Sequence, residues 1–573
     1  MLFLGEWCCR YRRRSAWQNL DVVVARPYGL GQASKDADRE AARILETALF
    51  ADFCAILNDH HGLQESQRYW RIVLGHWFRR CVDILFNRTR TLQQCLDEQQ
   101  PKATVILTGE RYHLATQDSN AAVWASNDDL WNHQLFARIL QNLQRPGLEL
   151  LGHDVTGPSG FEWQPGKPGK VGRRNTGLYG TLVALQRKVD KVVNRNARTY
   201  IQNSYLPRLV DFRLQALMGQ FPRLPADPVS LPPVAISGQL RADLSARLSQ
   251  TAASEVERVA RELIFELLPA CFLEGFGAVS AAAATVPWPL APDTIFTSNS
   301  FDTDEVFKVW SAEKVKRGAR YILGQHGNNY GAHRYFAHHS IEEEVADQFL
   351  TWGWQDGLPQ HTPAFIFKTV GKKPPAMNDQ GGLLLIEMPA QNRIVTWDSE
   401  AEFARYIEDQ KSFVSALQSE PRAQLNIRLH PASAHLDWDE VARWNEFDGT
   451  LKIDRGGRPI SEMLSASRLV VHGYDSTGIL ECIAMDIPMI AFWNDGLDHV
   501  RDSARPYYQA LVDAGLFHLS ADSAARHVNA IWGDVGGWWR SPEVVAARLA
   551  FAGRYAVASR APARDLRQIL ARA

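Results

Sequence analysis

Short apolar segments alternate with helical segments in the second half of the chain, and this alternation limits the possible fold more than any other feature. The strand candidates are "TIFTSN", "YILGQHG", "GLLLIEM", "LNIRLHP", "RLVVHGY" and "IPMIAFW", and the stretches between them mostly have helical spacing. Apolar strands that are separated by helices are typical of parallel sheets with both faces covered. We therefore predict an α/β fold.

The length of the chain predicts more than one domain. At 573 residues it exceeds what a single hydrophobic core usually holds. A polar linker at about 371–381 interrupts the strand and helix alternation. We predict two Rossmann-like domains that face a cleft, an N-terminal one over 1–370 with a helical extension and a C-terminal one over 371–573.

The extension that precedes the first strands is mostly helical. Two long segments between about 35 and 100 have apolar residues at helical spacing, with Ser66 as the candidate N-cap of the second. A further helix is expected after Ser126 or Asn127. The Gly-, Pro- and Arg-rich segment 157–177 predicts a loop, which is either a solvated linker or a basic lid over an anionic acceptor.

Charge and cysteine content argue against several classes of protein. The 63 Lys and Arg residues balance 64 Asp and Glu residues, whereas a nucleic-acid-binding protein usually has a basic excess. The sequence contains no apolar run of about 18 residues, so we predict no membrane span. The seven cysteines show no C-x-x-C spacing, so we expect reduced thiols and no zinc site.

The N-terminus does not have the order of a signal peptide, because its arginines follow the short apolar start. A cytoplasmic protein is therefore expected. The arginines at 12–14 and the basic loop could also contact anionic lipid on the cytoplasmic face of the inner membrane, and ordinary solvated charge is an equally good interpretation.

The first candidate site is the strand-to-helix turn in "LVVHGYDSTGILE". Asp475, Ser476, Thr477 and Gly478 would form a donor-phosphate site, because a helix start offers unsatisfied N–H groups and Ser476 and Thr477 add hydroxyls. Glu481, one turn further, could reach a ribose. The alternative is that Asp475 or Ser476 only caps the helix.

The second candidate site is the end of the strand in "NIRLHPAS". Proline ends the ladder, so the His430 imidazole should project from the strand tip before Pro431. Arg428 alternates with His430 along the strand and should face the same side. Either group could bind phosphate, and a structural turn is the alternative.

The third candidate site is "YILGQHGNNYG", where a strand runs into a Gly-Gln-His-Gly turn. An exposed imidazole at His326 would suit general-base catalysis on a hydroxyl. The alternative is a histidine satisfied by a backbone carbonyl. The other residues of this loop that we expect at the cleft are Gln325, Gly327, Asn328 and Tyr330.

Two further patterns favour structural roles over metal binding. The D-x-D of Asp302 and Asp304 is better explained as a helix cap, with Asp302 and Glu305 forming a capping box. The pair His338 and His339 has no third ligand at metal spacing. We predict no obligatory metal and no cofactor, and the missing G-x-G-x-x-G after a strand argues against a dinucleotide.

Longer segments resemble the transferases of bacterial surface-carbohydrate gene clusters. They include "LNDHHGLQESQRYWRIVLGHW", "NDDLWNHQLFARIL", "PACFLEGFG" and the region 295–354. The order of "RLHP" and "DSTG" is also similar in layout to GT-B transferases with cytidine-nucleotide donors. These are the Kdo and sialic-acid transferases that use CMP-sugars, and the CDP-glycerol glycerophosphotransferases of teichoic acid.

The resemblance implies a GT-B-like fold and roles for particular residues. His430 with Pro431, and Ser476 with Thr477, would hold the donor phosphate. His326 with Gly327 stands where the glycerophosphotransferases carry a His-Gly strand end, although this chain has no aromatic residue directly before that histidine. The catalytic base would be His326 or a carboxylate, for which Glu274 and Asp52 are candidates that could equally be surface charges.

The implied function is that of a glycosyltransferase. A nucleotide sugar, with a CMP-activated acidic sugar as one candidate, would donate to a hydroxyl of a surface-polysaccharide or lipopolysaccharide acceptor, and no nucleic acid would take part. One alternative is transfer of a phosphopolyol from a CDP-polyol. Alternatives of another class are a sugar-nucleotide-binding scaffold without turnover and an epimerase of the free sugar nucleotide.

Overall fold

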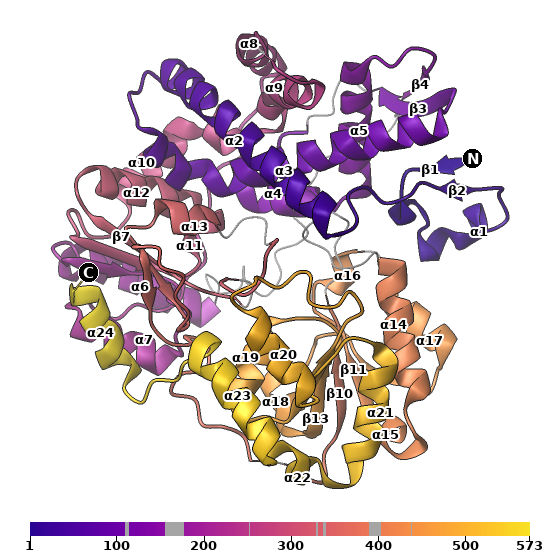
Figure 1. Ribbon diagram of the computed structural model, residues 1–573. Coiled ribbons are helices and arrows are strands. Elements are labelled where there is room, and N and C mark those ends of the chain that lie inside the picture. The colour runs from indigo at the N-terminus through magenta and orange to yellow at the C-terminus, as the bar shows by residue number, and fades with distance from the viewer. Residues whose placement is uncertain are drawn as a thin grey trace.

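The computed structural model describes residues 1–108, 114–154, 177–250, 252–327, 330–335, 340–376, 378–388, 403–436 and 438–572. Figure 1 shows a helical region above two sheets that are flanked by helices. The predicted basic loop, Asn328, His338 and His339 lie outside the described residues, apart from the last residue of that loop.

The sheet of the C-terminal half has the Rossmann strand order. Its parallel strands run in the order β12-β11-β10-β13-β14-β15, which is the 3-2-1-4-5-6 arrangement of doubly wound folds. The strand order reverses between β10 and β13, and ligands bind beyond the carboxyl ends of strands at such a point. The bounds are β10 Gly382–Ile386, β11 Leu425–Arg428, β12 Lys452–Asp454, β13 Ser467–His472, β14 Met489–Phe492 and β15 Phe517–His518.

The sheet of the N-terminal half is also parallel, with its strands in sequential order β5-β6-β7-β8-β9. The central strand β7 ends at Gly324, directly before Gln325 and His326. The bounds are β5 Thr199–Ile201, β6 Thr294–Thr297, β7 Arg320–Gly324, β8 Gln348–Thr351 and β9 His361–Pro363. The two helix-flanked parallel sheets agree with the predicted fold class, α/β and GT-B-like.

Two long helices organise the N-terminal region. They are α2 (Gln32–His61) and α3 (Gln67–Gln99), and the Ser66 hydroxyl accepts a hydrogen bond from the Tyr69 N–H, which confirms the predicted cap. Helix α3 packs against α2, α9 (Glu255–Leu267) and α12 (Glu305–Lys316). It therefore connects the helical region to the first sheet.

Two predicted helix caps were wrong by one or two residues. Helix α5 (Asp129–Leu143) is capped by Asp128, whose carboxylate accepts from the Trp131 N–H, while the Ser126 hydroxyl bonds the Val123 carbonyl instead. Helix α12 is capped by Asp304, which accepts from the Phe307 N–H. In both cases the carboxylate next to the first turn takes the N–H groups, which is the preferred N-cap arrangement.

The remaining elements cover the sheets or join them. In the N-terminal half they are β1 Leu2–Phe3, α1 Arg14–Trp17, β2 Val23–Val24, β3 Ala103–Thr108, α4 Ser119–Ala125, β4 Glu149–Asp154, α6 Gly177–Val193, α7 Arg208–Leu217, α8 Gly238–Leu248, α10 Phe276–Thr285, α11 Ser300–Thr303 and α13 Ser340–Val345. In the C-terminal half they are α14 Phe403–Ala416, α15 Ser419–Ala423, α16 Ser433–Leu436, α17 Glu440–Phe447, α18 Ile460–Ser465, α19 Thr477–Ala484, α20 Arg505–Asp513, α21 Ala521–Ile531, α22 Val535–Trp539, α23 Pro542–Tyr555 and α24 Pro562–Arg572.

The end of the chain returns to the first sheet. Helix α24 packs against α7 (Figure 1), and the Val557 N–H donates to the Trp352 carbonyl beyond β8. The last segment of the chain therefore packs against the N-terminal half. The predicted division at 370/371 stays a prediction. Within the described residues, no helix combines the length and the apolar content that a membrane crossing needs.

Candidate functional site

The two halves meet where loops follow β7 in the first sheet and β13 and β14 in the second, and we call this contact the seam. Residues 332–334 lie antiparallel to residues 499–501, with the Arg501 N–H donating to the Ala332 carbonyl and the Arg334 N–H donating to the His499 carbonyl. The Lys368 ammonium, which follows β9, forms an ion pair with Glu481 of α19 at 3.1 Å. The loops of both sheets therefore share one site.

His326 lies partly buried among aromatic rings of its own half. The rings of Tyr205 and Phe301 have their centroids 5.8 and 5.7 Å from that of the imidazole. Burial lowers the pKa of His326 to about 4, so the imidazole is neutral near pH 7. A neutral imidazole in this position can accept a proton.

A buried chain of hydrogen bonds orients this imidazole. The Tyr330 hydroxyl lies 3.0 Å from His326 Nδ1 and donates its proton to Glu342 Oε1 at 2.6 Å. Because the Tyr330 hydroxyl proton is donated to Glu342, the Tyr330 oxygen accepts a hydrogen bond from His326 Nδ1–H. Nε2 of His326 therefore keeps its lone pair. Burial raises the pKa of Glu342 well above its usual range, and Glu342 Oε2, 3.9 Å from His76 Nδ1, can carry the proton.

The start of α19 is the candidate site for an anion. Ser476 occupies the N-cap position, which was one alternative from the sequence. Its side chain caps no N–H group, however, and instead bonds His472 Nδ1 at 3.1 Å. A Cβ at Gly478 would lie 2.5 Å from His472 Cε1, so this turn needs glycine. A helix start beside a positioned hydroxyl has the dipole and the donor groups that suit a phosphate.

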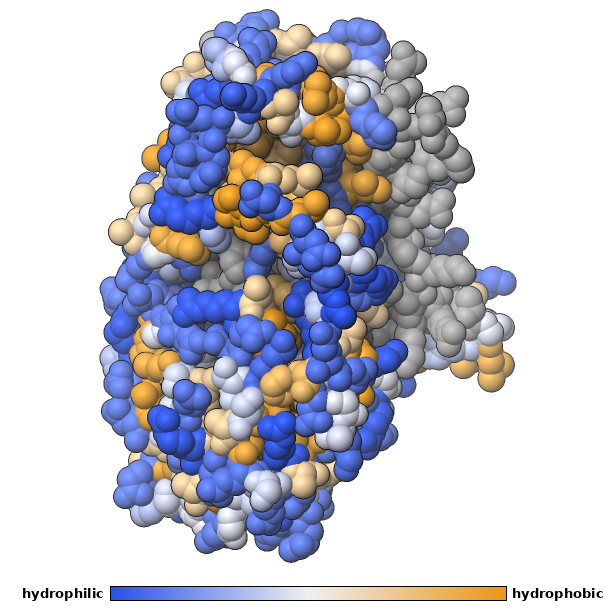
Figure 2. Space-filling model, turned by 90° about the vertical axis from the view of Figure 1, so that its right-hand side faces the viewer, coloured by the Kyte–Doolittle hydropathy of each residue, from blue (hydrophilic) through white to orange (hydrophobic). Residues whose placement is uncertain are grey.

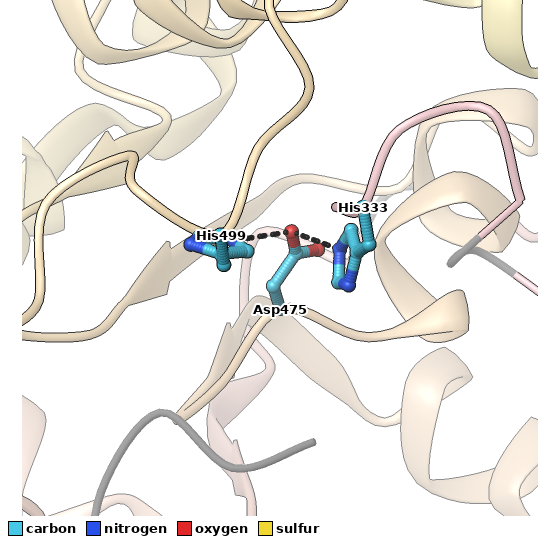
Figure 3. Close-up of side chains that lie close together, drawn as sticks. All are labelled: His333, Asp475 and His499. Carbon is cyan, nitrogen blue, oxygen red and sulfur yellow. Dashed lines mark hydrogen bonds and ion pairs between the residues drawn. The ribbon is translucent and has the colours of Figure 1, made fainter. Parts of the chain in front are cut away.

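Asp475 joins the two halves (Figure 3). Its Oδ2 accepts hydrogen bonds from His333 Nε2 at 2.7 Å, His499 Nε2 at 3.2 Å and the Tyr508 hydroxyl at 2.8 Å. Burial alone would raise its pKa, but the two imidazoles hold the pKa of Asp475 well below its usual range. The structure thus places this residue in a buried polar cluster across the seam.

The same cluster has a donor set that a divalent metal ion could use. The nearest ligand atoms of His333, Asp475 and His499 lie within 4.8 Å of one another. Two imidazoles and one carboxylate are common zinc ligands. Hydrogen bonds from the two imidazoles already occupy the Asp475 oxygen. The absence of an obligatory metal stays a prediction.

The end of β11 places His430 at the same sheet edge as α19. The exposed His430 accepts the Ala432 N–H at Nδ1, 3.1 Å away, which directs its proton to Nε2 in the neutral form. Strand β11 is separated from β13 by β10 only, or about 10 Å at the usual strand spacing. Arg428 pairs with Asp454 of β12 at 2.8 Å, and its charge is therefore used inside the sheet.

Other predicted residues lie in structural contacts. Glu274 forms an ion pair with Arg241 at 2.7 Å and accepts from the Ser237 N–H, and no described contact brings it to the seam. The Gln325 amide oxygen accepts from Trp354 Nε1 and from a backbone N–H, so it holds the loop that follows β8. Asp302 lies 3.3 Å from Arg80 and does not cap α12.

Several seam residues were not singled out from the sequence as site residues. His472 lies within a quoted motif, and its position three residues before Asp475 was the available signal. Glu342, Lys368, His499 and Tyr508 belong to no local motif, and their partners lie 12 to 113 residues away in the chain.

Comparison with solved structures gives distant likenesses. UDP-GlcNAc 2-epimerase from Neisseria meningitidis, bound to UDP-GlcNAc, is 10% identical over 82% of this chain and 99% of its own, with a TM-score of 0.33. MurG from Acinetobacter baumannii is 10% identical over 82% and 100%, with a TM-score of 0.29. WaaG, a glycosyltransferase involved in lipopolysaccharide biosynthesis, is 11% identical over 65% and 99%, with a TM-score of 0.27.

These likenesses are too weak to say anything about function. No match was found among curated proteins. A family model named LIC12162 family transferase, however, matches residues 1–570, which is nearly the whole chain. This match confirms the predicted transferase class, and the chain therefore belongs to the LIC12162 family of transferases.

Proposed function

We propose that the protein is a glycosyltransferase that moves a sugar from a nucleotide-activated donor to a hydroxyl of a surface-carbohydrate acceptor. One observation carries the proposal. The imidazole of His326 in the first half packs near Tyr205, the Lys368 ammonium lies 5.6 Å from the Tyr205 ring centroid, and Lys368 forms an ion pair with Glu481 of α19 in the second half. His326 can bind a hydroxyl acceptor, and the start of α19 can bind an anionic leaving group.

The C-terminal half would hold the donor. The N–H groups at the start of α19 and the Ser476 hydroxyl would bind the phosphate, and His430 Nε2–H would donate to it from the end of β11, two strands away. Glu481 would accept a ribose hydroxyl while it keeps its contact with Lys368. Positioned donors of this kind stabilise negative charge as it develops on the leaving phosphate.

The N-terminal half would activate the acceptor. As the bond from the sugar to the nucleotide phosphate breaks, the acceptor oxygen forms a bond to the sugar and His326 Nε2 takes the hydroxyl proton. The leaving nucleotide keeps the electron pair of the broken bond. Tyr330 and Glu342 would hold the tautomer that makes Nε2 the acceptor.

A cytidine donor, a lipopolysaccharide acceptor and a cytoplasmic site of action are also parts of this proposal. The resemblance of the His-Pro and Ser-Thr motifs to CMP-sugar and CDP-glycerol transferases supports the cytidine nucleotide. The seven cysteines are all free thiols, which is usual in a reducing compartment.

Ligand binding and product analysis test the proposal. A panel of nucleotides and nucleotide sugars should raise the melting temperature with a cytidine nucleotide in first place, and mass spectrometry of the product should show a sugar added without phosphorus. Phosphorus in the new linkage would replace the proposal by phosphopolyol transfer. Nucleotide binding without product from any acceptor would favour the scaffold alternative.

A further inference from the structure

A cavity of about 910 Å³ lies in the N-terminal region, away from the candidate site. The N-terminal segment with β1 and α1 forms one side of it, and helices α3 and α5 with strands β3 and β4 form the rest. Figure 2 views the side of the molecule on which α1 lies in Figure 1, and there apolar surface gathers beside a recess. Characteristic lining residues are Leu2, Trp7, Leu92, Val105, Phe136 and Leu151.

The lining is mainly apolar, and part of it is open to solvent. Val105 is 51% exposed and Leu151 is 44% exposed, although both belong to the parallel pair β3–β4. Ligand-binding cavities are usually 300–1,000 Å³ in volume and mostly apolar. Exposed apolar patches mark places where an apolar partner binds. The chemistry of the cavity therefore fits a hydrocarbon chain.

Arg13 is an exposed cationic group at this cavity. Arg10, Arg12 and Arg14 of the basic N-terminal run form ion pairs with Asp129, Asp439 and Glu446, respectively. Arg13 lines the cavity and is exposed, and no carboxylate among the described residues pairs with it. The basic run thus offers a single available guanidinium, which faces an apolar chamber.

Helix α3 gives the distance between the cavity and the candidate site. Its residue His76 lies 3.9 Å from Glu342 of the chain that orients His326, whereas its residue Leu92 lines the cavity. An α-helix rises 1.5 Å per residue, so these two points lie about 24 Å apart along α3. Both belong to the half that we propose to bind the acceptor.

We propose that the cavity holds the hydrocarbon chain of a lipid-linked acceptor, whose phosphate pairs with Arg13 at the cavity. The glycan attached to that phosphate then spans the distance to His326. This inference rests on the proposed function, since it names the class of acceptor for the same site.

Calorimetric titration of the full-length protein with butyl, octyl, decyl and dodecyl phosphate, below their micelle concentrations, tests the proposal. Affinity should increase by up to about fourfold for each added methylene group, because each one leaves water for the apolar cavity. Affinity that is independent of chain length would overturn the proposal.

Two variants and a matched control locate the binding. Val105→Asp places a charge in the apolar wall and should weaken dodecyl phosphate binding by about tenfold or more. Val193→Asp makes the same change at an exposed valine of α6 that does not line the cavity, and it should bind like the wild type. Equal affinities in these two variants would place the chain elsewhere and refute the proposal.

Arg13→Gln tests the anionic end. It should weaken dodecyl phosphate binding by about fivefold and leave binding of the neutral dodecyl maltoside unchanged. An equal loss for both ligands would contradict the phosphate contact. These measurements need neither donor nor turnover. Binding that depends on alkyl-chain length, without any sugar transfer, would refute the proposed function alone. Sugar transfer without such binding would refute this inference alone.

Discussion

At the scale of single residues, the candidate base is defined by its partners. An imidazole at the end of a strand could have many roles, but the hydrogen bonds from His326 through Tyr330 to Glu342 assign its proton to Nδ1. Burial keeps the ring neutral near pH 7. The sequence predicted His326 and Tyr330 at one site, whereas Glu342 could not be predicted, because nothing in the sequence shows that a buried carboxylate of α13 ends this chain.

We expect Tyr330→Phe to lower kcat by about 10–100-fold with little effect on donor affinity. The change removes the oxygen that accepts from His326 Nδ1–H and so releases the tautomer. Steady-state kinetics and nucleotide titration measure the two quantities. Tyr205→Phe is the matched control, because its ring packs near His326 without a described hydrogen bond to it. Equal kcat values for both variants would contradict an orienting role of the Tyr330 hydroxyl.

The contribution of His326 and His472 to stability should decrease as the pH falls from about 6.5 to about 4. Burial lowers the pKa values of His326 and His472 to about 4, below the usual 6.5 that applies when the chain is unfolded. Between these values each of the two histidines binds more proton in the unfolded chain, so their contribution to the free energy of unfolding rises with pH and is lost on acidification. His472→Gln should make the melting temperature depend less on pH in this window. An unchanged dependence would argue against a neutral buried His472.

At the scale of elements, strand identities follow from local sequence and helix starts do so only in part. Strands β10, β11, β13 and β14 were predicted because each is a short apolar run with turn residues at its ends, whereas the two-residue strand β15 was not predicted. The caps of α5 and α12 were not, because Asp128 and Asp304 compete with neighbouring polar residues for the same N–H groups. The start of α19 was predicted, but the contact of Ser476 with His472 depends on packing between the strand and the helix.

Gly478→Ala should destabilise the protein by about 1–3 kcal/mol and weaken nucleotide binding. Its Cβ would lie 2.5 Å from His472 Cε1, so the ring or the helix start must move. Gly553→Ala in α23 is the control, since nothing lies within 4 Å of its Cβ and alanine favours a helix. Denaturant unfolding should separate the two variants, and equal stabilities would mean that the turn tolerates a side chain.

At the scale of the whole molecule, the contact between the halves was predicted only in outline. The sequence indicated two parallel-sheet units that face each other, and it could not show which residues meet, because the partners of Asp475 come from residues 333, 499 and 508. Asp475 was expected beside a phosphate or at a helix cap. In the structure it is a buried acceptor that holds a loop of the first half.

Chelation of metal ions tests the role of that cluster. If its hydrogen bonds hold the seam, dialysis against EDTA should leave the melting temperature and the turnover unchanged. Zinc added afterwards should likewise give no activation. A loss of turnover on chelation that zinc restores in the wild type, but not in His499→Ala, would show that His333, Asp475 and His499 bind a metal that the reaction needs.

The central claim is that groups from both halves act on one substrate at the seam. The most direct measurement is kcat and donor dissociation constant, determined side by side for His326→Gln and Ser476→Ala with the donor found by nucleotide screening. The account predicts that His326→Gln loses kcat by about 100-fold or more and keeps donor affinity, while Ser476→Ala loses donor affinity. Wild-type kcat in His326→Gln, or unchanged donor affinity in Ser476→Ala, would contradict it.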